Sequence, residues 1–268
     1  MIIIGERING MFGDVKRGIQ ERDKEVIQNL ALDQMKAGAD YLDVNVGPAV
    51  PSAQKGDAMV WLIETIQEAT DAPICIDSPR LSDIQAALGV IKNPAMINST
   101  QADPEQLATY VQLAVDNDAS LIALAMDKSG IPQDTDKRIE LASLIVVSAM
   151  EGGLPFDKLL IDPIVLPVNA MQRQAGLVLD ALSQLKLLAD PPPHFVVGLS
   201  NISQGAKERD LINRTYVAMS IAAGLDAAIA DPFDTEFMDA VITAELLMNK
   251  QIYSDSYLTA YRSSKGIG

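Results

Sequence analysis

The feature that most constrains the fold is a short pattern that recurs along the chain, an apolar run that ends abruptly in Asp, Asn or Ser. The clearest example is FVVGLSNISQ at residues 195–204, where the apolar run stops after Leu199 and is followed by Ser200, Asn201 and Ser203. Runs of this kind are typical of buried strands that present polar groups at their carboxyl ends. Strands are predicted at residues 2–5, 41–46, 74–77, 95–99, 121–126, 159–162, 195–199 and 227–230.

Segments with the apolar periodicity of a helix separate these runs. Gly38 favours the end of the first predicted helix, and Asp57 is a suitable N-cap for the second. Asp103, Pro104 and Glu105 supply an N-cap, a first-turn proline and a first-turn acid for the fourth. Helices are predicted at residues 25–38, 58–69, 81–90, 104–117, 137–151, 175–189, 211–223 and 234–249.

Eight strands that alternate with eight helices imply parallel pairing, and eight parallel strands close a barrel. We therefore predict an α/β fold, a (β/α)8 TIM barrel, formed by residues 1–268 as a single domain with residues 258–268 as a loose tail. Barrels of about 250 residues are routinely one domain, so the length agrees. The alternative is an open doubly wound sheet. Such a sheet normally carries a glycine-rich phosphate-binding turn after its first strand, and GERING has the wrong spacing for it.

The composition limits both the chemistry and the partners. The 36 acidic residues outnumber the 21 basic ones without a basic cluster, so nucleic acid and anionic membranes are not expected partners. No apolar stretch reaches the length of a membrane span and no signal peptide is recognisable, so a cytoplasmic location is expected. Cys75 and His194 are the only residues of their types and are expected to be structural, which leaves carboxylates, amides and hydroxyls for the chemistry.

In a TIM barrel the carboxyl ends of all strands meet at one face, where active sites lie. Several carboxylates and amides that face one cavity form an array of donors and acceptors suited to a flat, nitrogen-rich heterocycle. The residues predicted at this face are Glu6, Arg7, Asn9, Asp43, Asn45, Asp77, Ser78, Asn98, Ser99, Asp127, Asp162, Ser200, Asn201, Gln204 and Asp231.

Structural interpretations stay open for several of these residues. Asp43 and Asp231 also fit solvated strand ends or caps, and Glu6 with Arg7 also fits an ion pair at the barrel rim. Asn98, at the centre of MINST, also fits a turn former. A divalent metal held by the carboxylates is a further alternative.

The blocks GERING, LDVNVGPAV, ICIDS, MINST, LLIDPIVLP, GLSNISQ and LINRTYVAM follow one another along the chain. With these blocks the chain resembles the pterin-binding methyltransferases, specifically the methyltetrahydrofolate and corrinoid-protein methyltransferases of acetogenic and methylotrophic anaerobes. The folate-binding portion of cobalamin-dependent methionine synthase is similar but more distant. Dihydropteroate synthase shares the fold and the pterin pocket, but its first-strand and last-strand signatures are missing here.

The resemblance implies roles for individual residues. Asp77, Asn98 and Asp162 match residues that hydrogen-bond the pterin ring, and Asn201 matches the catalytic asparagine that approaches N5, the atom that carries the methyl group. The remaining expected folate-binding residues are Gly198, Ser200, Gln204 and Lys186, and the expected supporting residues are Asp43, Asn45, Glu6 and Arg209.

The resemblance also implies the reaction, which is methyl transfer between N5 of tetrahydrofolate and the cobalt of a corrinoid carried by a separate protein. Transfer to Co(I) requires positive charge on N5, because an amine that carries a methyl group is otherwise a poor leaving group. Neutral Asn201 is suited to accept a hydrogen bond from protonated N5, with support from Asp43 or Asp77. A homodimer without a metal of its own is expected. The direction of transfer stays open, and the alternatives are an enzyme like dihydropteroate synthase and a non-enzymatic folate-binding protein.

Overall fold

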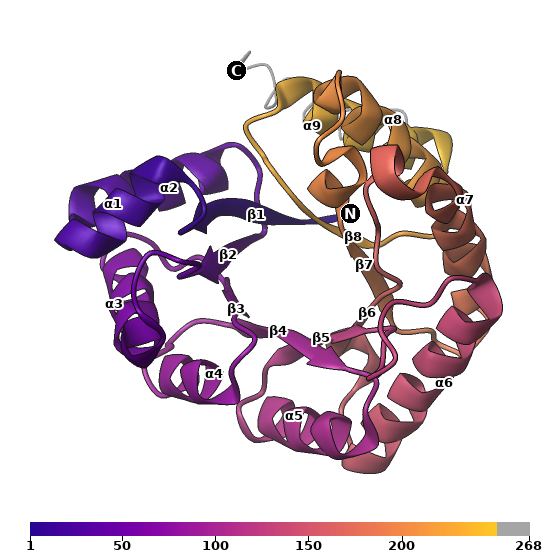
Figure 1. Ribbon diagram of the computed structural model, residues 1–268, viewed down its shortest axis with the longest axis horizontal. Helices are drawn as coiled ribbons and strands as arrows, with labels where there is room; N and C mark the ends of the chain where they lie inside the picture. Colours follow the sequence, from indigo (N-terminus) through magenta and orange to yellow (C-terminus); the bar gives the residue numbers. More distant parts are fainter. Residues whose placement is uncertain (251–268) are drawn as a thin grey trace.

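The computed structural model describes residues 1–250 of the chain, and the tail predicted at residues 258–268 lies outside them. Within the described residues, eight parallel strands pair in chain order and the first pairs with the last, so the sheet closes into a barrel (Figure 1). The predicted TIM barrel is therefore confirmed. The strands are β1 (Ile2–Asn9), β2 (Tyr41–Asn45), β3 (Ile74–Asp77), β4 (Ala95–Gln101), β5 (Ser120–Leu124), β6 (Leu159–Asp162), β7 (His194–Gly198) and β8 (Ala227–Ala230).

Helices follow the strands and form the outer ring of the barrel (Figure 1). They are α1 (Gly13–Glu21), α2 (Lys24–Lys36), α3 (Lys55–Gln67), α4 (Leu81–Leu88), α5 (Pro104–Asp116), α6 (Thr135–Gly152), α7 (Val168–Leu185), α8 (Arg209–Ala222) and α9 (Thr235–Leu247). Short 3-10 turns are η1 (Ser52–Gln54), η2 (Phe156–Lys158) and η3 (Leu199–Ser203). None of the described helices is long and apolar enough to cross a membrane.

Local capping signals account for some helix boundaries and not for others. The Asp103 side chain accepts a hydrogen bond from the Gln106 backbone N–H, which confirms the predicted start of α5. The N-cap predicted at Asp57 is wrong, because α3 begins two residues earlier and Asp57 lies in its first turn. The sequence pattern also does not predict α1, a short helix whose N-cap residue Phe12 makes no side-chain hydrogen bond.

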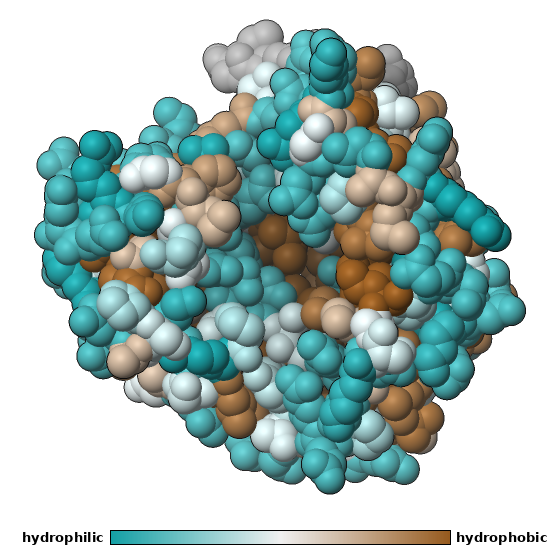
Figure 2. All heavy atoms as spheres, in the orientation of Figure 1, coloured by the Kyte–Doolittle hydropathy of each residue, from teal (hydrophilic) through white to brown (hydrophobic). Residues whose placement is uncertain are grey.

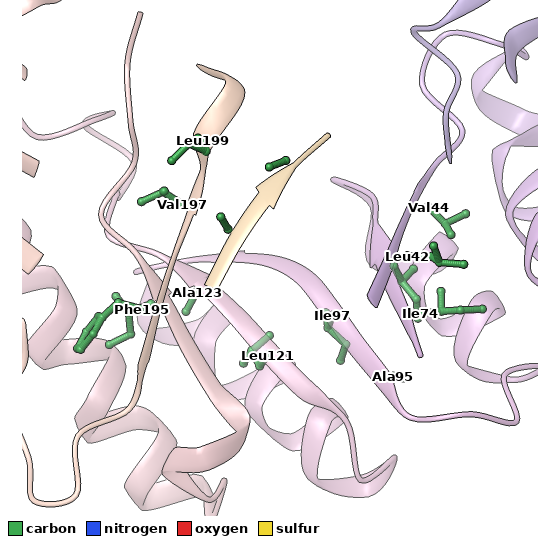
Figure 3. Close-up of a cluster of buried hydrophobic side chains, with 14 of the residues drawn as sticks. Leu42, Val44, Ile74, Ala95, Ile97, Leu121, Ala123, Phe195, Val197 and Leu199 are labelled. Carbon is green, nitrogen blue, oxygen red and sulfur yellow. The ribbon is translucent and has the colours of Figure 1, made fainter. Parts of the chain in front are cut away.

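Most of the apolar core lies between the strands and the surrounding helices. Alternate strand residues point outward to this layer, since successive side chains of a strand face opposite sides of the sheet. Figure 3 shows members of this cluster on β2 to β5 and on β7, among them Leu42, Ile74, Ile97, Leu121 and Phe195, all fully buried.

A second, smaller apolar layer fills the inside of the barrel. Its buried members are Ile4, Cys75, Met96, Ile122, Leu160, Val196 and Ala227, at least one from each strand except β2. Cys75 is a free, fully buried thiol in this layer, as expected of a structural residue. The layer closes the barrel interior and forms the base on which the mouth residues stand.

Candidate functional site

A cavity of about 350 Å³ opens at the carboxyl ends of the strands, a size within the usual range for small-molecule sites. Figure 2, which has the orientation of Figure 1, shows a hollow at the centre of this face. The cavity is lined by Glu6, Asn9, Asp43, Asp77, Asn98, Ser99, Leu124, Met126, Asp162, Ile164, Gly198, Asn201 and Ile229.

The alternation of strand side chains explains why these residues meet. Asp77, Asn98 and Asp162 each follow by two positions a residue of the inner apolar layer, namely Cys75, Met96 and Leu160. A step of two returns the side chain to the same face of the strand, one level nearer the mouth. The apolar interior therefore determines which polar residues form the walls of the cavity.

Two carboxylate and amide pairs form the wall on the side of β2 to β4. The Asn98 side chain donates to Asp43 Oδ1 at 3.2 Å, and the Asn45 side chain donates to Asp77 Oδ2 at 2.6 Å. Burial, and secondarily the neighbouring Asp77, raises the pKa of Asp43 well above its usual value. Burial also raises the pKa of Asp77, against the opposing hydrogen bond from Asn45. Asp43 is only 2% exposed, so its interpretation as a solvated strand end is wrong.

Asp162 lies on the opposite wall of the cavity, at the end of β6, and within the described residues it has no side-chain amide partner like those of Asp43 and Asp77. Its Oδ1 atom accepts a hydrogen bond from the Ile164 backbone N–H at 2.7 Å, and no lysine or arginine forms an ion pair with it among residues 1–250. Burial raises the pKa of Asp162 to about 7, although backbone hydrogen bonds oppose the shift. This carboxyl group is therefore placed to exchange its proton for a hydrogen bond from a ligand near neutral pH.

Glu6 connects the first strand to the seventh. The regular pairing of β1 with β2 is interrupted between Gly5 and Ile8, and Glu6 lines the cavity from this irregular segment. The Ser200 hydroxyl donates to Glu6 Oε1 at 2.7 Å, and burial raises the pKa of Glu6 despite that bond. The predicted site residues Glu6 and Ser200 are thus in direct contact.

The alternative ion pair between Glu6 and Arg7 is not what the structure shows. Arg7 instead approaches Asp231 at 3.5 Å and lies over the Phe12 ring. Asp231 also accepts a hydrogen bond from the Phe233 backbone N–H in the turn after β8, whereas the N-cap of α9 is Asp234, so Asp231 is not a helix cap. Arg7 and Asp231 accordingly belong to the rim and do not line the cavity.

Asn201 lies on the 3-10 turn η3 directly after β7, and its side chain faces the cavity. In the described part of the chain no hydrogen bond occupies its side-chain amide. A Cβ atom at position 198 would lie 2.8 Å from Asn201 Nδ2, so a larger residue there would displace the Asn201 amide. Gly198 therefore contributes by leaving room for the Asn201 amide.

Five of the predicted folate-binding and supporting residues do not line the cavity, namely Asn45, Lys186, Ser200, Gln204 and Arg209. Asn45 and Ser200 contact lining residues, Asp77 and Glu6 respectively. Arg209 stands behind η3, where its Nε atom donates to Ser203 Oγ at 3.2 Å, and Gln204 is exposed after the same turn. Lys186 lies at the opposite end of the barrel, where its Nζ atom is 2.6 Å from Asp226 Oδ2. The structure does not bring Lys186 together with the other site residues, because the end of α7 approaches the beginning of β7 and β8.

Sequence reasoning missed the apolar part of the lining, formed by Leu124, Met126, Ile164 and Ile229. Leu124 and Ile229 follow inner-layer residues by two positions, which is the signal that would have found them.

Among residues 1–250 no group of three or more His, Cys, Asp or Glu side chains is arranged to hold a metal ion. The site thus offers a mixed wall of acceptors, amides and apolar faces to a planar ligand.

Comparison with known proteins agrees with this arrangement. Residues 6–231 match the protein family described as pterin binding enzyme. The chain is 32% identical over 269 residues to methylcorrinoid:tetrahydrofolate methyltransferase of Eubacterium limosum, an alignment that covers 99% of this chain and 97% of that protein. It is 28% identical over 243 residues to methionine synthase of Mycobacterium leprae, which covers 85% of this chain and 20% of that protein.

Solved structures share the barrel. A dihydropteroate synthase of Coxiella burnetii in complex with pteroic acid superposes with a TM-score of 0.71 over 93% of this chain and 94% of that one. A dihydropteroate synthase of Xanthomonas albilineans in complex with 7,8-dihydropteroate gives a TM-score of 0.67 over 92% of each chain. The sequence identities are 14% and 17%, so these likenesses concern the fold alone.

Proposed function

Because the chain belongs to the family of pterin-binding enzymes, we propose that it is a methyltransferase that moves a methyl group between N5 of tetrahydrofolate and the cobalt of a separate corrinoid protein. The observation that carries the proposal is the free amide of Asn201 in the same cavity as Asp77, Asn98 and Asp162. Asp77, Asn98 and Asp162 suit recognition of a pterin, and Asn201 suits chemistry at one of its nitrogens.

Recognition of the pterin depends on cavity carboxylates that form no ion pair with a lysine or arginine among residues 1–250. The aminopyrimidine edge of a pterin carries N–H donors, and an ionised carboxylate accepts them through charge-assisted hydrogen bonds. Asp77 and Asp162 face the cavity from opposite sides, and Asn98 has an amide that both donates and accepts. The apolar side chains of Leu124 and Ile229 give the flat ring a surface to pack against.

The role that we assign to Asn201 follows from the charge that must develop on N5. From methyltetrahydrofolate, the bond between N5 and the methyl carbon breaks with its electron pair remaining on N5, and Co(I) supplies the pair of the new bond. Asn201 Oδ1 accepts a hydrogen bond from the N–H of protonated N5 and so stabilises the positive charge that makes N5 a good leaving group; that charge is neutralised as the methyl group leaves. In the opposite direction neutral N5 attacks the methyl group of methyl-Co(III), and the same residue acts on the same barrier.

The surroundings of the cavity support access by a second protein. Exposed apolar side chains lie on segments that follow β1, β6, β7 and β8, namely Met11, Met171, Leu211 and Phe233. A corrinoid held by a partner must approach N5 across this mouth, and apolar side chains are the usual anchors of such contacts. We also propose that the protein is a cytoplasmic homodimer of methylotrophic metabolism whose interface leaves both mouths open, and light scattering tests the dimer.

The proposal is tested by supplying purified corrinoid proteins and following the methyl group in both directions. We expect 5-methyltetrahydrofolate to form from a methylated corrinoid protein and tetrahydrofolate, or methyl-Co(III) to form from the reverse mixture. Folate binding without transfer to or from any corrinoid would indicate a storage or carrier protein. Formation of dihydropteroate from a pterin pyrophosphate and p-aminobenzoate would indicate the synthase reaction instead.

A further inference from the structure

A buried arginine stands behind the wall of the cavity. Arg138, on α6, is 0% exposed, and no carboxylate forms an ion pair with it in the described part of the chain. Its guanidinium donates to Pro163 O at 2.8 Å, Asp134 O at 3.1 Å and Gln174 Oε1 at 2.7 Å, which are all neutral acceptors. Burial lowers the pKa of Arg138, and the charges of Asp134 and Asp162 oppose this, so the guanidinium is a buried charge that lies near acids without a direct ion pair.

The hydrogen bond to Pro163 fixes the turn after β6. Pro163 lies between Asp162 and Ile164, which both line the cavity. Ile164 has φ 64°, a left-handed backbone that is unfavourable for a β-branched residue, and its N–H donates to Asp162 Oδ1 at 2.7 Å. Arg138 thus holds the carbonyl between the carboxylate and the strained residue that orients it.

Neighbouring helices hold the guanidinium in place. Gln174 on α7 is 4% exposed and accepts from Arg138, while its own side-chain N–H group lies 3.1 Å from Gln133 Oε1. Tyr216 on α8 donates to Ala175 O at 3.0 Å, which ties α8 to α7. These contacts leave the arginine few alternative positions.

We propose that Arg138 is a positioning residue for pterin recognition, which fixes the turn after β6 and provides the positive charge that faces Asp162 from behind. The inference rests on the proposed function, since the pterin is the ligand that Asp162 is expected to bind.

In the described part of the chain few charged groups act on Asp162, so the effect of Arg138 on it can be tested. Arg138 is the cation that acts on it, while the Ile164 and Gly198 backbone N–H groups donate to it. Tyr216 lies near both groups, and burial raises the pKa of its phenol, which is therefore neutral. Glu6, Asp43 and Asp77 line the same cavity as further acidic groups. Burial raises the pKa of Asp162 to about 7, and the Arg138 charge opposes this rise.

The test compares Arg138→Lys, which keeps a charge, with Arg138→Met, which removes it; both lose the planar fork of donors. The Asp162 carboxyl is titrated by carbon-13 NMR without ligand, and calorimetry measures 5-methyltetrahydrofolate affinity from pH 6 to 9. For Arg138→Met we expect the Asp162 midpoint to rise by about 1 pH unit and affinity at pH 7 to fall about 5-fold, recovering toward pH 9. For Arg138→Lys the midpoint stays near the wild-type value. An Asp162 midpoint that does not rise in Arg138→Met would overturn the proposal.

A third variant covers the case in which Arg138→Met does not fold. Gln174→Glu places a carboxylate beside the guanidinium without removing it, so the Asp162 midpoint is expected to rise as well. An unchanged midpoint in this variant overturns the proposal. The NMR titration needs no folate, so it tests the role of Arg138 separately from the proposed function. A wild-type protein that binds no folate refutes the proposed function, whereas a charge-independent Asp162 midpoint refutes the role of Arg138.

Discussion

Buried acids at the two ends of the barrel have pKa values shifted in opposite directions. At the amino end, Asp226 accepts hydrogen bonds from Lys186 Nζ at 2.6 Å and from the Phe195 backbone N–H at 3.0 Å. Burial alone would raise the pKa of Asp226, but the nearby His194, the Lys186 ammonium and the Phe195 backbone N–H outweigh it and lower the pKa. At the mouth, Asp162 forms no such ion pair within residues 1–250, and its pKa is raised to about 7.

The difference indicates which acids serve the fold and which serve a ligand. An acid that is paired with a cation has its acceptors occupied and contributes to stability. A buried acid without a cation is unfavourable in the free protein, and such acids are typical of functional sites. Among residues 1–250 no cation forms an ion pair with Asp43, Asp77 or Asp162, and Arg138 acts on Asp162 only through its charge, so we interpret the mouth as a site whose missing donors are supplied by the substrate.

The largest effect is expected at Asn201. Asn201→Ala should slow methyl transfer by about 10²-fold or more, a loss of about 3 kcal/mol of transition-state stabilisation, because its amide acts on the charge that develops on N5. Folate affinity should fall less. Single-turnover transfer and calorimetry on the same folded variant give both quantities. Equal losses in rate and affinity, or a normal rate at saturation, would show that Asn201 does not activate N5.

Asp162→Asn should weaken folate binding by about 1–3 kcal/mol, since one charge-assisted acceptor becomes a neutral amide. Asn98→Ala should weaken it by a similar amount through the loss of its hydrogen bonds. Calorimetry at pH 8 measures both losses. Unchanged affinity in correctly folded variants would remove these residues from the pterin site.

The same Asp162→Asn variant should be more stable than the wild type at pH 8 without ligand. The folded pKa of Asp162, about 7, exceeds its ordinary value of 3.8, so the folded state binds this proton more tightly. That contribution to stability is present below about pH 4 and is lost as the pH rises through 7. Denaturant unfolding at pH 5 and pH 8 measures the gain, which is expected to be larger at the higher pH. A lower stability of Asp162→Asn than of the wild type at both pH 5 and pH 8 would contradict the view that Asp162 is unfavourable in the free protein.

At the amino end we expect the reverse result. Lys186→Met should lower the free energy of unfolding by about 1 kcal/mol, because it leaves Asp226 without its cation. Folate affinity should not change, since Lys186 lies at the far end of the barrel. Because the pKa of Asp226 is lowered, its contribution is present above its ordinary pKa and is lost on acidification, so the difference between variant and wild type should shrink at low pH. A large loss of folate affinity would return Lys186 to the site.

The smallest effect is expected from removal of metal ions. Dialysis of the enzyme against a strong chelator should leave methyl transfer intact once the corrinoid protein is added afterwards, because we assign the mouth carboxylates to N–H donors of the pterin. Loss of activity that an added divalent metal restores would mean that these carboxylates bind a metal ion instead.

Local patterns in the sequence were sufficient for the barrel and for most of the polar site. The strands at Ile74–Asp77, Leu159–Asp162 and Ala227–Ala230 match their predictions because an apolar run and its polar end are contiguous in the chain. The partnership between Asn98 and Asp43 joins residues 55 positions apart, and no local pattern reports it.

Other features could not be predicted because they depend on the packing of distant segments. Arg138 reads as an ordinary polar residue of an amphipathic helix, and only the fold shows that it is buried behind Asp162. Lys186 was assigned to the site by resemblance alone, and the path of α7 places it at the opposite end. The start of α7 at Val168, seven residues before the prediction, was also missed, because Met171 interrupts its helical geometry.

The most direct test of the account is the proton balance of pterin binding. Calorimetry of 5-methyltetrahydrofolate binding at pH 6.5, in buffers of different ionisation enthalpy, measures the protons exchanged. If Asp162 gives up its proton to accept the N–H groups of the pterin, binding should release about half a proton or more, and Asp162→Asn should release correspondingly less. A binding enthalpy that is independent of the buffer, or the same proton release in Asp162→Asn, would contradict the claim that the mouth acids are kept for the ligand.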